Sequence, residues 1–294
     1  MIDKIRQEAH IPVLLNEVVQ ILDPKPKETI LDLTAGYGGH SLALRARTSG
    51  WPITLVDRDQ MAISHLKLKF NDQRVEILHS DFLKASEVLA GQNRRYDIIL
   101  ADLGLSSPHL NIASRGFSFN KDGPLDMRMD SSQELTAHEV VNQYSKEEIK
   151  HILKIYGEEH KAGRIAREIV KNRPISSTQQ LAKIVSKVFP GYKKTHPATK
   201  TFQAIRIAVN DELQQLEKAL PLWVEMLKPG GRLAVISFHS LEDRIVKNIF
   251  SELAGKRYDS ILEILTKSPV TADKNELVYN PRARSAKLRV AVKK

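Results

Sequence analysis

The chain has 294 residues, with 45 lysines and arginines against 35 aspartates and glutamates, a net charge of +10, and no cysteine. A hydrophobic content of 41% excludes wholesale disorder, and the lack of cysteine excludes disulfides, Cys-ligated metal centres and thiol catalysis. No apolar run reaches the roughly 20 residues of a membrane span and no signal peptide opens the chain, so we expect a cytoplasmic protein of about two domains, or one domain with an insertion.

The first hundred residues alternate short apolar runs with amphipathic stretches, which is typical of βαβ units in a parallel sheet. The first run ends in a Gly-rich turn at residues 35–39, and a helix over 40–47 follows the turn. A second helix ends at Phe70. The predicted strands of this region are 29–34, 53–57, 75–79 and 96–102.

The middle of the chain has a different pattern. Residues 105–135 are rich in Ser, Gly, Pro, Asp and Arg, which predicts a long ordered loop, and residues 136–216 are helical in pattern. Thr136 and Ser145 are each followed by Glu three positions later, so both predict capping boxes, and Ser177 predicts another helix start.

The last part returns to the α/β pattern. A helix over 216–227 and a turn over 228–231 precede three more predicted strands, at 232–238, 261–265 and 287–292. We therefore predict a doubly wound α/β domain, residues 1–110 and 217–294, that is interrupted by an inserted helical domain, residues 111–216.

The positive charge is concentrated in two zones. Residues 161–200 carry ten basic residues and a single acid, Glu168, while residues 282–294 carry six basic residues and no acid. Two basic zones on a mildly acidic body predict a polyanion-binding surface. Solvated helical faces and a frayed tail remain the alternative.

Acidic residues end three of the predicted strands, at Asp32, Asp57 and Asp102, and ligands of open α/β sheets bind at that edge. The glycines of the turn, Gly36, Gly38 and Gly39, let the backbone approach a ligand closely. Asp57 is placed to accept hydrogen bonds from a ribose diol. Position 41, where a dinucleotide fingerprint has a third glycine, is Ser41, and Asp32 would repel a pyrophosphate but suits a cation. The pattern therefore favours S-adenosylmethionine over a dinucleotide, with a plain tight turn among surface acids as the alternative.

Three neighbouring residues each allow two interpretations. Phe82 could stack on an adenine or belong to the core, and Asp81 could accept from the adenine amino group or cap a helix. His40 could contact the carboxylate of the cofactor or simply open a helix.

Ten motifs form one ordered series along the chain, among them Asp122-Gly-Pro-Leu-Asp-Met-Arg128. They lie at residues 10–15, 38–41, 56–59, 102–108, 115–119, 122–130, 156–159, 196–203, 236–244 and 280–285. Through them the sequence resembles the MraW-type (RsmH) family of 16S ribosomal RNA (cytosine N4)-methyltransferases over nearly its whole length.

The resemblance implies a Rossmann-like methyltransferase sheet, an inserted helical RNA-binding domain, and methyl transfer from S-adenosylmethionine to N4 of a cytidine in the decoding region. The implied partner is 16S ribosomal RNA or the small ribosomal subunit; no metal is expected, and a homodimer is left open. The implied cofactor contacts are Gly38, Gly39, His40, Asp57, Phe82 and Asp102. His109 occupies a cofactor-contacting position where the family usually has Gln, and Lys200 replaces the usual Arg of the motif that begins at His196.

Asp102 is the candidate acceptor for the N–H groups of the exocyclic amine, and the loop after it, with Ser107, is a candidate substrate contact or merely a connection. His239, at the end of the fifth predicted strand, is expected to line the base pocket. Arg115 and Arg128, with Phe117 and Phe119, resemble a loop that stacks an unpaired base, although both Phe side chains could instead anchor the loop. His196 and Lys200 complete the candidate substrate-binding set.

Three rival functions are weighed. A non-catalytic ribosome-assembly protein is disfavoured by the intact acids and glycines, and a nicotinamide-dependent dehydrogenase by Ser41. A methyltransferase of small molecules is disfavoured by the basic zones, which do not distinguish DNA from RNA.

Overall fold

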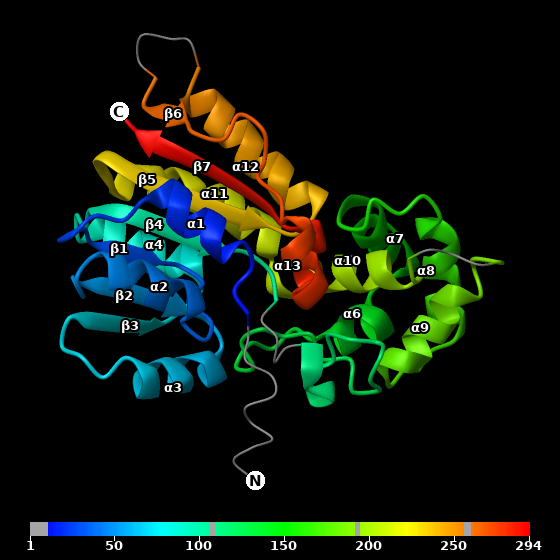
Figure 1. Cartoon of the computed structure of the whole chain (residues 1–294). Coiled ribbons are helices and arrows are strands. Elements are labelled where there is room, and N and C mark those ends of the chain that lie inside the picture. The colour runs from blue at the N-terminus through cyan, green and yellow to red at the C-terminus, as the bar shows by residue number, and fades with distance from the viewer. Residues whose placement is uncertain (1–10, 106–109, 192–194, 256–259) are drawn as a thin grey trace. The chain divides into compact units, whose positions relative to one another are not determined.

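Two compact units make up the protein in the computed structural model, which describes residues 11–105, 110–191, 195–255 and 260–294 (Figure 1). The α/β unit consists of Met1–Gly104 and Leu213–Lys294, and the helical unit consists of Leu105–Glu212. Within the described ranges, none of the helices combines the length and the apolar character that crossing a bilayer requires.

Seven strands of the α/β unit form one sheet in the order β3-β2-β1-β4-β5-β7-β6, which can be followed in Figure 1. The first five strands of this order are parallel, whereas β7 runs antiparallel to both β5 and β6. The strands are β1 (Ile30–Asp32), β2 (Ile53–Asp57), β3 (Val75–His79), β4 (Tyr96–Asp102), β5 (Leu227–Ser237), β6 (Leu262–Ile264) and β7 (Lys287–Lys293).

Alternate residues of the central strands are buried on opposite faces of the sheet, as helices on both sides require. Leu31 packs with α4, α11 and α12 on one face, and its neighbour Ile30 packs with α1, α2 and α3 on the other. The helices of this unit are α1 (Leu15–Leu22), α2 (Gly39–Arg47), α3 (Gln60–Lys69), α4 (Phe82–Gly91), α11 (Glu212–Met226), α12 (Ser240–Leu253), α13 (Lys274–Tyr279) and the 3-10 helix η3 (Pro281–Ser285).

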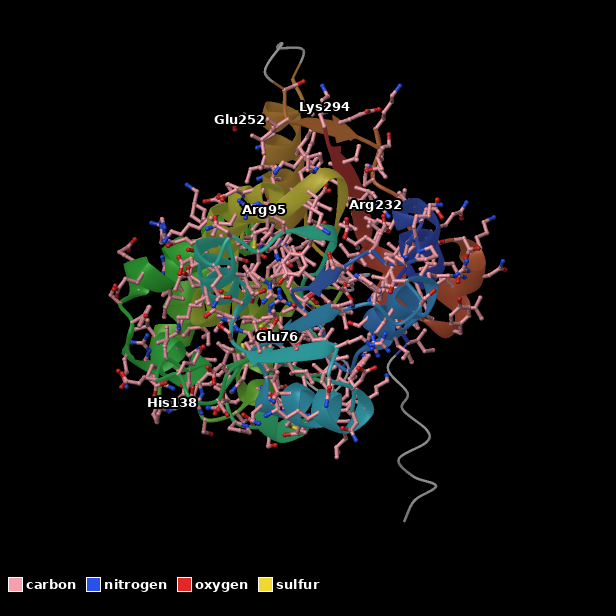
Figure 2. The ribbon with its side chains drawn as sticks, turned by 90° about the vertical axis from the view of Figure 1, so that its left-hand side faces the viewer. Glu76, Arg95, His138, Arg232, Glu252 and Lys294 are labelled. Carbon is pink, nitrogen blue, oxygen red and sulfur yellow. The ribbon has the colours of Figure 1, made fainter. Side chains whose placement is uncertain are left out.

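The turn predicted at residues 228–231 is wrong, because these residues belong to β5. Tyr96 of β4 pairs with Leu227, and the next paired residue, Ile98, already faces Arg232. The surplus residues of β5 form a bulge in which Gly230 has a φ of 76°. Arg232, labelled in Figure 2, then fixes α1 to the sheet: its Nε donates to the Leu22 carbonyl (2.9 Å) and its Nη1 pairs with Glu28 (2.7 Å).

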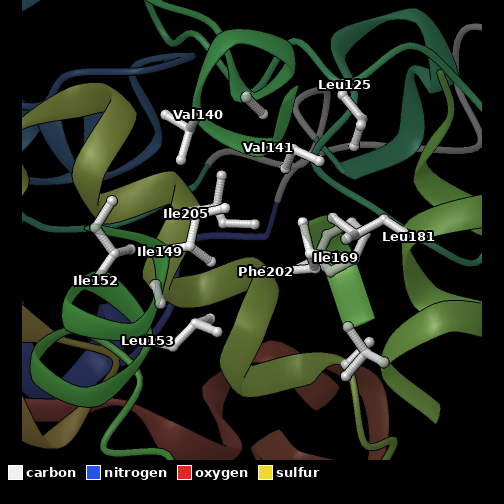
Figure 3. Packing of buried hydrophobic residues seen from close by; sticks show 14 of the residues in the cluster. Leu125, Val140, Val141, Ile149, Ile152, Leu153, Ile169, Leu181, Phe202 and Ile205 are labelled. Carbon is white, nitrogen blue, oxygen red and sulfur yellow. The ribbon is translucent and has the colours of Figure 1, made fainter. Parts of the chain in front are cut away.

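The helical unit has its own core, shown in Figure 3, in which side chains such as Val141, Ile169 and Phe202 are buried together. Capping boxes occur at Thr136 and Ser145, as predicted, and the Ser177 side chain caps another helix. The elements are η2 (Ala113–Arg115), α6 (Ala137–Gln143), α7 (Lys146–Ile155), α8 (Ala162–Lys171), α9 (Thr178–Ser186) and α10 (Thr199–Asn210).

Candidate active site

The Gly-rich turn after β1 packs against its neighbours at two of its three glycines. A Cβ atom at Gly38 would lie 2.5 Å from a ring carbon of Phe70, and one at Gly39 would lie 2.3 Å from Pro12 Cγ. Gly36, with a φ of 51°, faces open space instead, because a Cβ there would meet only the Thr34 carbonyl, at 3.9 Å. Among the described residues of the turn, Gly36 is thus the glycine whose Cβ direction is open, and the cofactor contacts of Gly38 and Gly39 remain predictions.

Asp57, at the end of β2, closes this turn. Its Oδ2 accepts from the Gly36 N–H (2.7 Å) and its Oδ1 accepts from the Asp59 N–H (2.8 Å). A ribose contact of Asp57 remains a prediction. The sequence predicted a ribose contact for Asp57 but not its role in shaping the turn.

Asp32 is only 2% exposed at the end of β1. It accepts from the Ser41 hydroxyl and from the Thr34 N–H (3.2 Å). Burial raises the pKa of the Asp32 carboxyl to about 6, against the effect of the Ser41 hydrogen bond. Ser41 stands where a dinucleotide fingerprint has a glycine, and its hydroxyl donates a hydrogen bond to the buried carboxyl of Asp32.

Asp102 ends β4 beside these groups. Its N–H donates to Thr34 Oγ1 (2.6 Å), and its Oδ2 lies 3.6 Å from His40 Nδ1. Its Oδ1 is buried and has no hydrogen-bond partner among the described residues. Burial raises the pKa of Asp102 well above its usual range, and the charges of Asp32 and Glu242 raise it further. A buried acceptor without a donor is costly, which makes Asp102 Oδ1 a candidate to accept a hydrogen bond from a ligand.

His40 is buried in the first turn of α2, and the chain before α1 holds it there. His40 Nε2 lies 2.9 Å from the Val13 carbonyl, which only accepts, so Nε2 carries the proton and Nδ1 faces Asp102. The next residue, Leu14, donates its N–H to Glu276 Oε1 in α13 (2.9 Å), and Asn280 donates to the same oxygen (3.2 Å). We call Val13, Leu14, Glu276 and Asn280 the N-terminal clamp.

The two residues after β3 differ in their surroundings. Asp81 caps α4 by accepting from the Lys84 N–H (2.8 Å), so the capping interpretation describes its side chain. Phe82 is partly buried, and its ring meets Trp223 edge-on with centroids 5.6 Å apart. A stacking contact of Phe82 with adenine remains a prediction.

His239 follows β5 as the N-cap of α12. Its Nδ1 accepts from the Glu242 N–H (3.3 Å), and its Nε2 lies 3.1 Å from Glu242 Oε1. The other carboxylate oxygen of Glu242 accepts from the Phe238 N–H (2.8 Å) and the His239 N–H (3.2 Å). Glu242 was not predicted; the His-x-x-Glu spacing was the available signal, but histidine is not among the usual N-cap residues.

The predicted substrate residues lie in the helical unit. Arg115 donates to the carbonyls of Arg128 (3.0 Å) and Met129 (2.9 Å), and Arg128 forms a two-bond pair with Asp126 (2.9 and 2.8 Å). Phe117 is buried in the core of this unit. These three side chains therefore stabilise the loop, and the two arginines as RNA contacts remain a prediction.

Phe119 is also anchored, since its ring stacks on His196 (4.3 Å between centroids) and meets Phe202 edge-on. Lys200 is exposed and donates to the Glu158 carbonyl (3.0 Å). The two remaining predicted residues, Ser107 and His109, lie outside the described residues.

The model of the MraW methylase family matches residues 7–294. The chain belongs to this family. It is 49% identical over 285 residues to a "Ribosomal RNA small subunit methyltransferase H" of Cyanothece sp., a match that covers 96% of this chain and 94% of that protein. A protein of the same name in Acidobacterium capsulatum is 46% identical over 301 residues, covering 98% and 99%.

Among solved structures, an rRNA methylase from Streptococcus thermophilus is similar with a TM-score of 0.44 and 10% identity, covering 97% of this chain and 99% of that one. The sheet of this MraW methylase family member is the Rossmann-like sheet of the S-adenosylmethionine-dependent methyltransferases, and S-adenosylmethionine is its methyl donor.

The residues of the α/β unit fit this cofactor. Its sulfonium and ammonium groups are cationic, and Asp32 and Asp102 are buried acids that a nearby cation would help to ionise. Asp57 presents a carboxylate at the end of β2, and the backbone at Gly36 leaves open space beside it.

Proposed function

We propose that this protein transfers a methyl group from S-adenosylmethionine to N4 of a cytidine in the decoding region of 16S ribosomal RNA. The name carried by its relatives supports small-subunit ribosomal RNA as the substrate. The resemblance of the motifs supports the cytosine amine as the acceptor. The observation that carries the proposal is the buried Asp102 carboxyl at the end of β4, with one oxygen free of hydrogen bonds among the described residues.

The exocyclic amine of cytosine is a poor nucleophile because its lone pair is delocalised into the ring. When bound, S-adenosylmethionine supplies an electrophilic methyl group on a good leaving group. Asp102 accepts an N–H of the amine, which localises the nitrogen lone pair, and then takes the proton that N4 loses. The raised pKa of Asp102 makes its carboxylate a stronger base than an exposed aspartate.

Asp32 supports this step electrostatically. Its charge disfavours ionisation of Asp102, and a cationic ligand between the two acids would offset that repulsion. His40 holds Nδ1 near Asp102 Oδ2 and restricts where that carboxyl can turn. The basic helical unit is the part that binds the RNA, whether as free RNA or in the small subunit.

The decisive experiment incubates the protein with unmodified small subunits, or with free 16S RNA, and a cofactor labelled in the methyl group. We expect nucleoside mass spectrometry to find the label in N4-methylcytidine. Label in another nucleoside, or in none, would overturn the assignment.

Asp102→Asn is the matched variant, because it keeps the size of the side chain but cannot take a proton. We expect turnover to fall on the order of 100- to 1000-fold. Calorimetric titration with S-adenosylmethionine should show binding by both proteins. Absence of binding by the wild type would favour the non-catalytic assembly protein.

A further inference from the structure

Two open grooves flank α8 on the surface of the helical unit. The larger, about 550 Å³, lies between α7 and α8, which pack side by side (Figure 1). It is lined by Lys146, Glu147, Lys150, His160, Lys161, Gly163, Arg164 and Arg167. The second, about 390 Å³, runs along α8 toward the end of α9 and is lined by Arg164, Arg167, Glu168, Lys187 and Val188. Arg164 and Arg167 border both grooves and form a ridge between them.

The amphipathic pattern of α8 dictates this ridge. Ile165, Ala166 and Ile169 are buried in the core, so Arg164 and Arg167 are left on the opposite, exposed face. The helix needs neither arginine for its own packing. Gly163 widens the larger groove: a Cβ atom there would meet only Lys150 Cδ, at 3.8 Å.

The charges in the grooves are not balanced by the acids beside them. Glu147 is paired with Lys146 (3.1 Å) and Lys150 (3.0 Å), so its charge is already shared. Lys161 is held by the Val188 carbonyl (3.2 Å) and lies over the Phe189 ring (4.5 Å). Arg164 and Arg167 have no ion pair or side-chain hydrogen bond in the part of the chain that the structure describes.

We propose that the Arg164–Arg167 ridge and its two grooves bind consecutive phosphates of the substrate RNA backbone. This inference rests on the proposed function, which supplies RNA as the polyanion. Two free guanidinium groups, one helical turn apart, offer paired donors to phosphate oxygens. The lysines that line the grooves add positive potential along the path of the strand.

The test compares Arg164→Gln/Arg167→Gln with wild type and with Lys247→Gln/Lys267→Gln, which removes the same charge from exposed positions of the α/β unit. Affinity for unmodified 16S RNA is measured across a salt series. We expect the ridge variant to bind at least 10-fold more weakly, with a salt slope about 1.4 to 1.8 units shallower, which corresponds to two lost phosphate contacts. The control variant should keep more of the affinity, and both should bind S-adenosylmethionine like wild type.

A second variant, Gly163→Leu, fills the larger groove without altering charge. It should weaken RNA binding while the helix stays folded, because Leu is a better helix former than Gly. Equal RNA affinity of wild type, ridge variant and Gly163→Leu would overturn the ridge even if wild type methylates RNA. Loss of affinity in the ridge variant without methylation by wild type would instead refute the proposed function alone. Equally tight binding of duplex DNA, with the same loss in the ridge variant, would refute RNA as the ligand.

Discussion

Asp32 and Asp102 are two buried carboxyls beneath one Gly-rich turn, and ionising either costs free energy in the absence of a cation. Ser41 partly offsets that cost for Asp32. Asp102 Oδ1, by contrast, has no donor among the described residues. The site is therefore arranged at the expense of the stability of the unliganded protein.

Asp32→Asn should make this cost measurable. The pKa of Asp32 is raised from 3.8 to about 6 in the folded state. Between these two values the native protein therefore keeps a proton on Asp32 that the unfolded chain has lost. The contribution of Asp32 to stability without cofactor should therefore fall by about 2–3 kcal/mol as pH rises from about 4 to about 6, in addition to the decline that the raised pKa of Asp102 causes. In Asp32→Asn the part of the decline due to Asp32 should be absent, the part due to Asp102 should remain, and the affinity for S-adenosylmethionine should be reduced. Thermal unfolding across the pH range gives the stability of both proteins. Parallel stability–pH curves for variant and wild type would contradict a free-energy cost of ionising Asp32.

His239 can be tested with two replacements, because the structure shows it as a cap. Asn is a good N-cap and Ala is a poor one, so His239→Ala should lose about 1 kcal/mol of stability and His239→Asn little. If the imidazole contacts the base, both variants should lose turnover at least 10-fold with little change in cofactor affinity. Wild-type turnover by His239→Asn would leave capping as the role of His239.

At the scale of elements, the N-terminal clamp joins α13 to the Gly-rich turn. Glu276→Ala leaves the Leu14 N–H buried without the Glu276 acceptor, at a cost of about 1–3 kcal/mol in stability. The Val13 carbonyl belongs to the same peptide group, so it is no longer held in the position that orients His40. We expect S-adenosylmethionine to bind roughly 10-fold more weakly by calorimetry. Glu276→Gln retains an acceptor oxygen and should restore most of the affinity. If Ala and Gln variants bind equally well, the clamp does not position the site.

The strands that could be predicted are those whose own residues are sufficient to indicate a strand, without knowledge of their partners in the sheet. β2, β3 and β4 were predicted with their observed bounds, because each is an unbroken β-rich run between turn residues. The bulge in β5 could not be, since Lys228-Pro-Gly-Gly231 reads locally as a turn and only pairing with β4 keeps it in the sheet. α13 was missed because it is short and its contacts with Leu14 span 262 positions.

The candidate site shows the same division. Strand ends identified Asp32, Asp57 and Asp102, because parallel strands bring their carboxyl ends together. The contacts that position His40 beside Asp102 were not predictable. Val13 is far from His40 in the sequence, as Glu276 is from Leu14, and no local pattern links the members of either pair. Arg115 carries a charge that suggests a ligand, yet its carbonyl partners lie 13 and 14 residues away in a loop whose path the sequence does not specify.

At the scale of the whole molecule, the two basic zones differ in what their charges do. In the C-terminal zone, Lys287 (3.0 Å) and Arg289 (2.7 Å) pair with Asp243. Lys293 Nζ donates to three carbonyl groups near the end of α11. These three bases stabilise the α/β unit, and the polyanion surface of both zones remains a prediction.

Arg289→Gln separates the two roles. Of the two cationic partners of Asp243 among the described residues it leaves only Lys287, and it should destabilise the protein by about 2–3 kcal/mol in chemical unfolding. The salt slope of RNA binding should stay near that of wild type, because Arg289 is buried. If the salt slope of RNA binding became shallower while stability stayed unchanged, Arg289 would contribute to RNA binding rather than to the stability of the α/β unit.

The position of β7 bears on how the protein is made. β5 and β6 leave the ribosome before β7, the strand that lies between them and pairs with both. Until β7 follows, one side of β5 offers unpaired backbone groups that can join another chain. The residues of the helical unit are consecutive and can be completed earlier. We therefore expect a nascent chain that carries a folded helical unit while the sheet of the α/β unit is unfinished, with chaperone dependence confined to the last stage of synthesis.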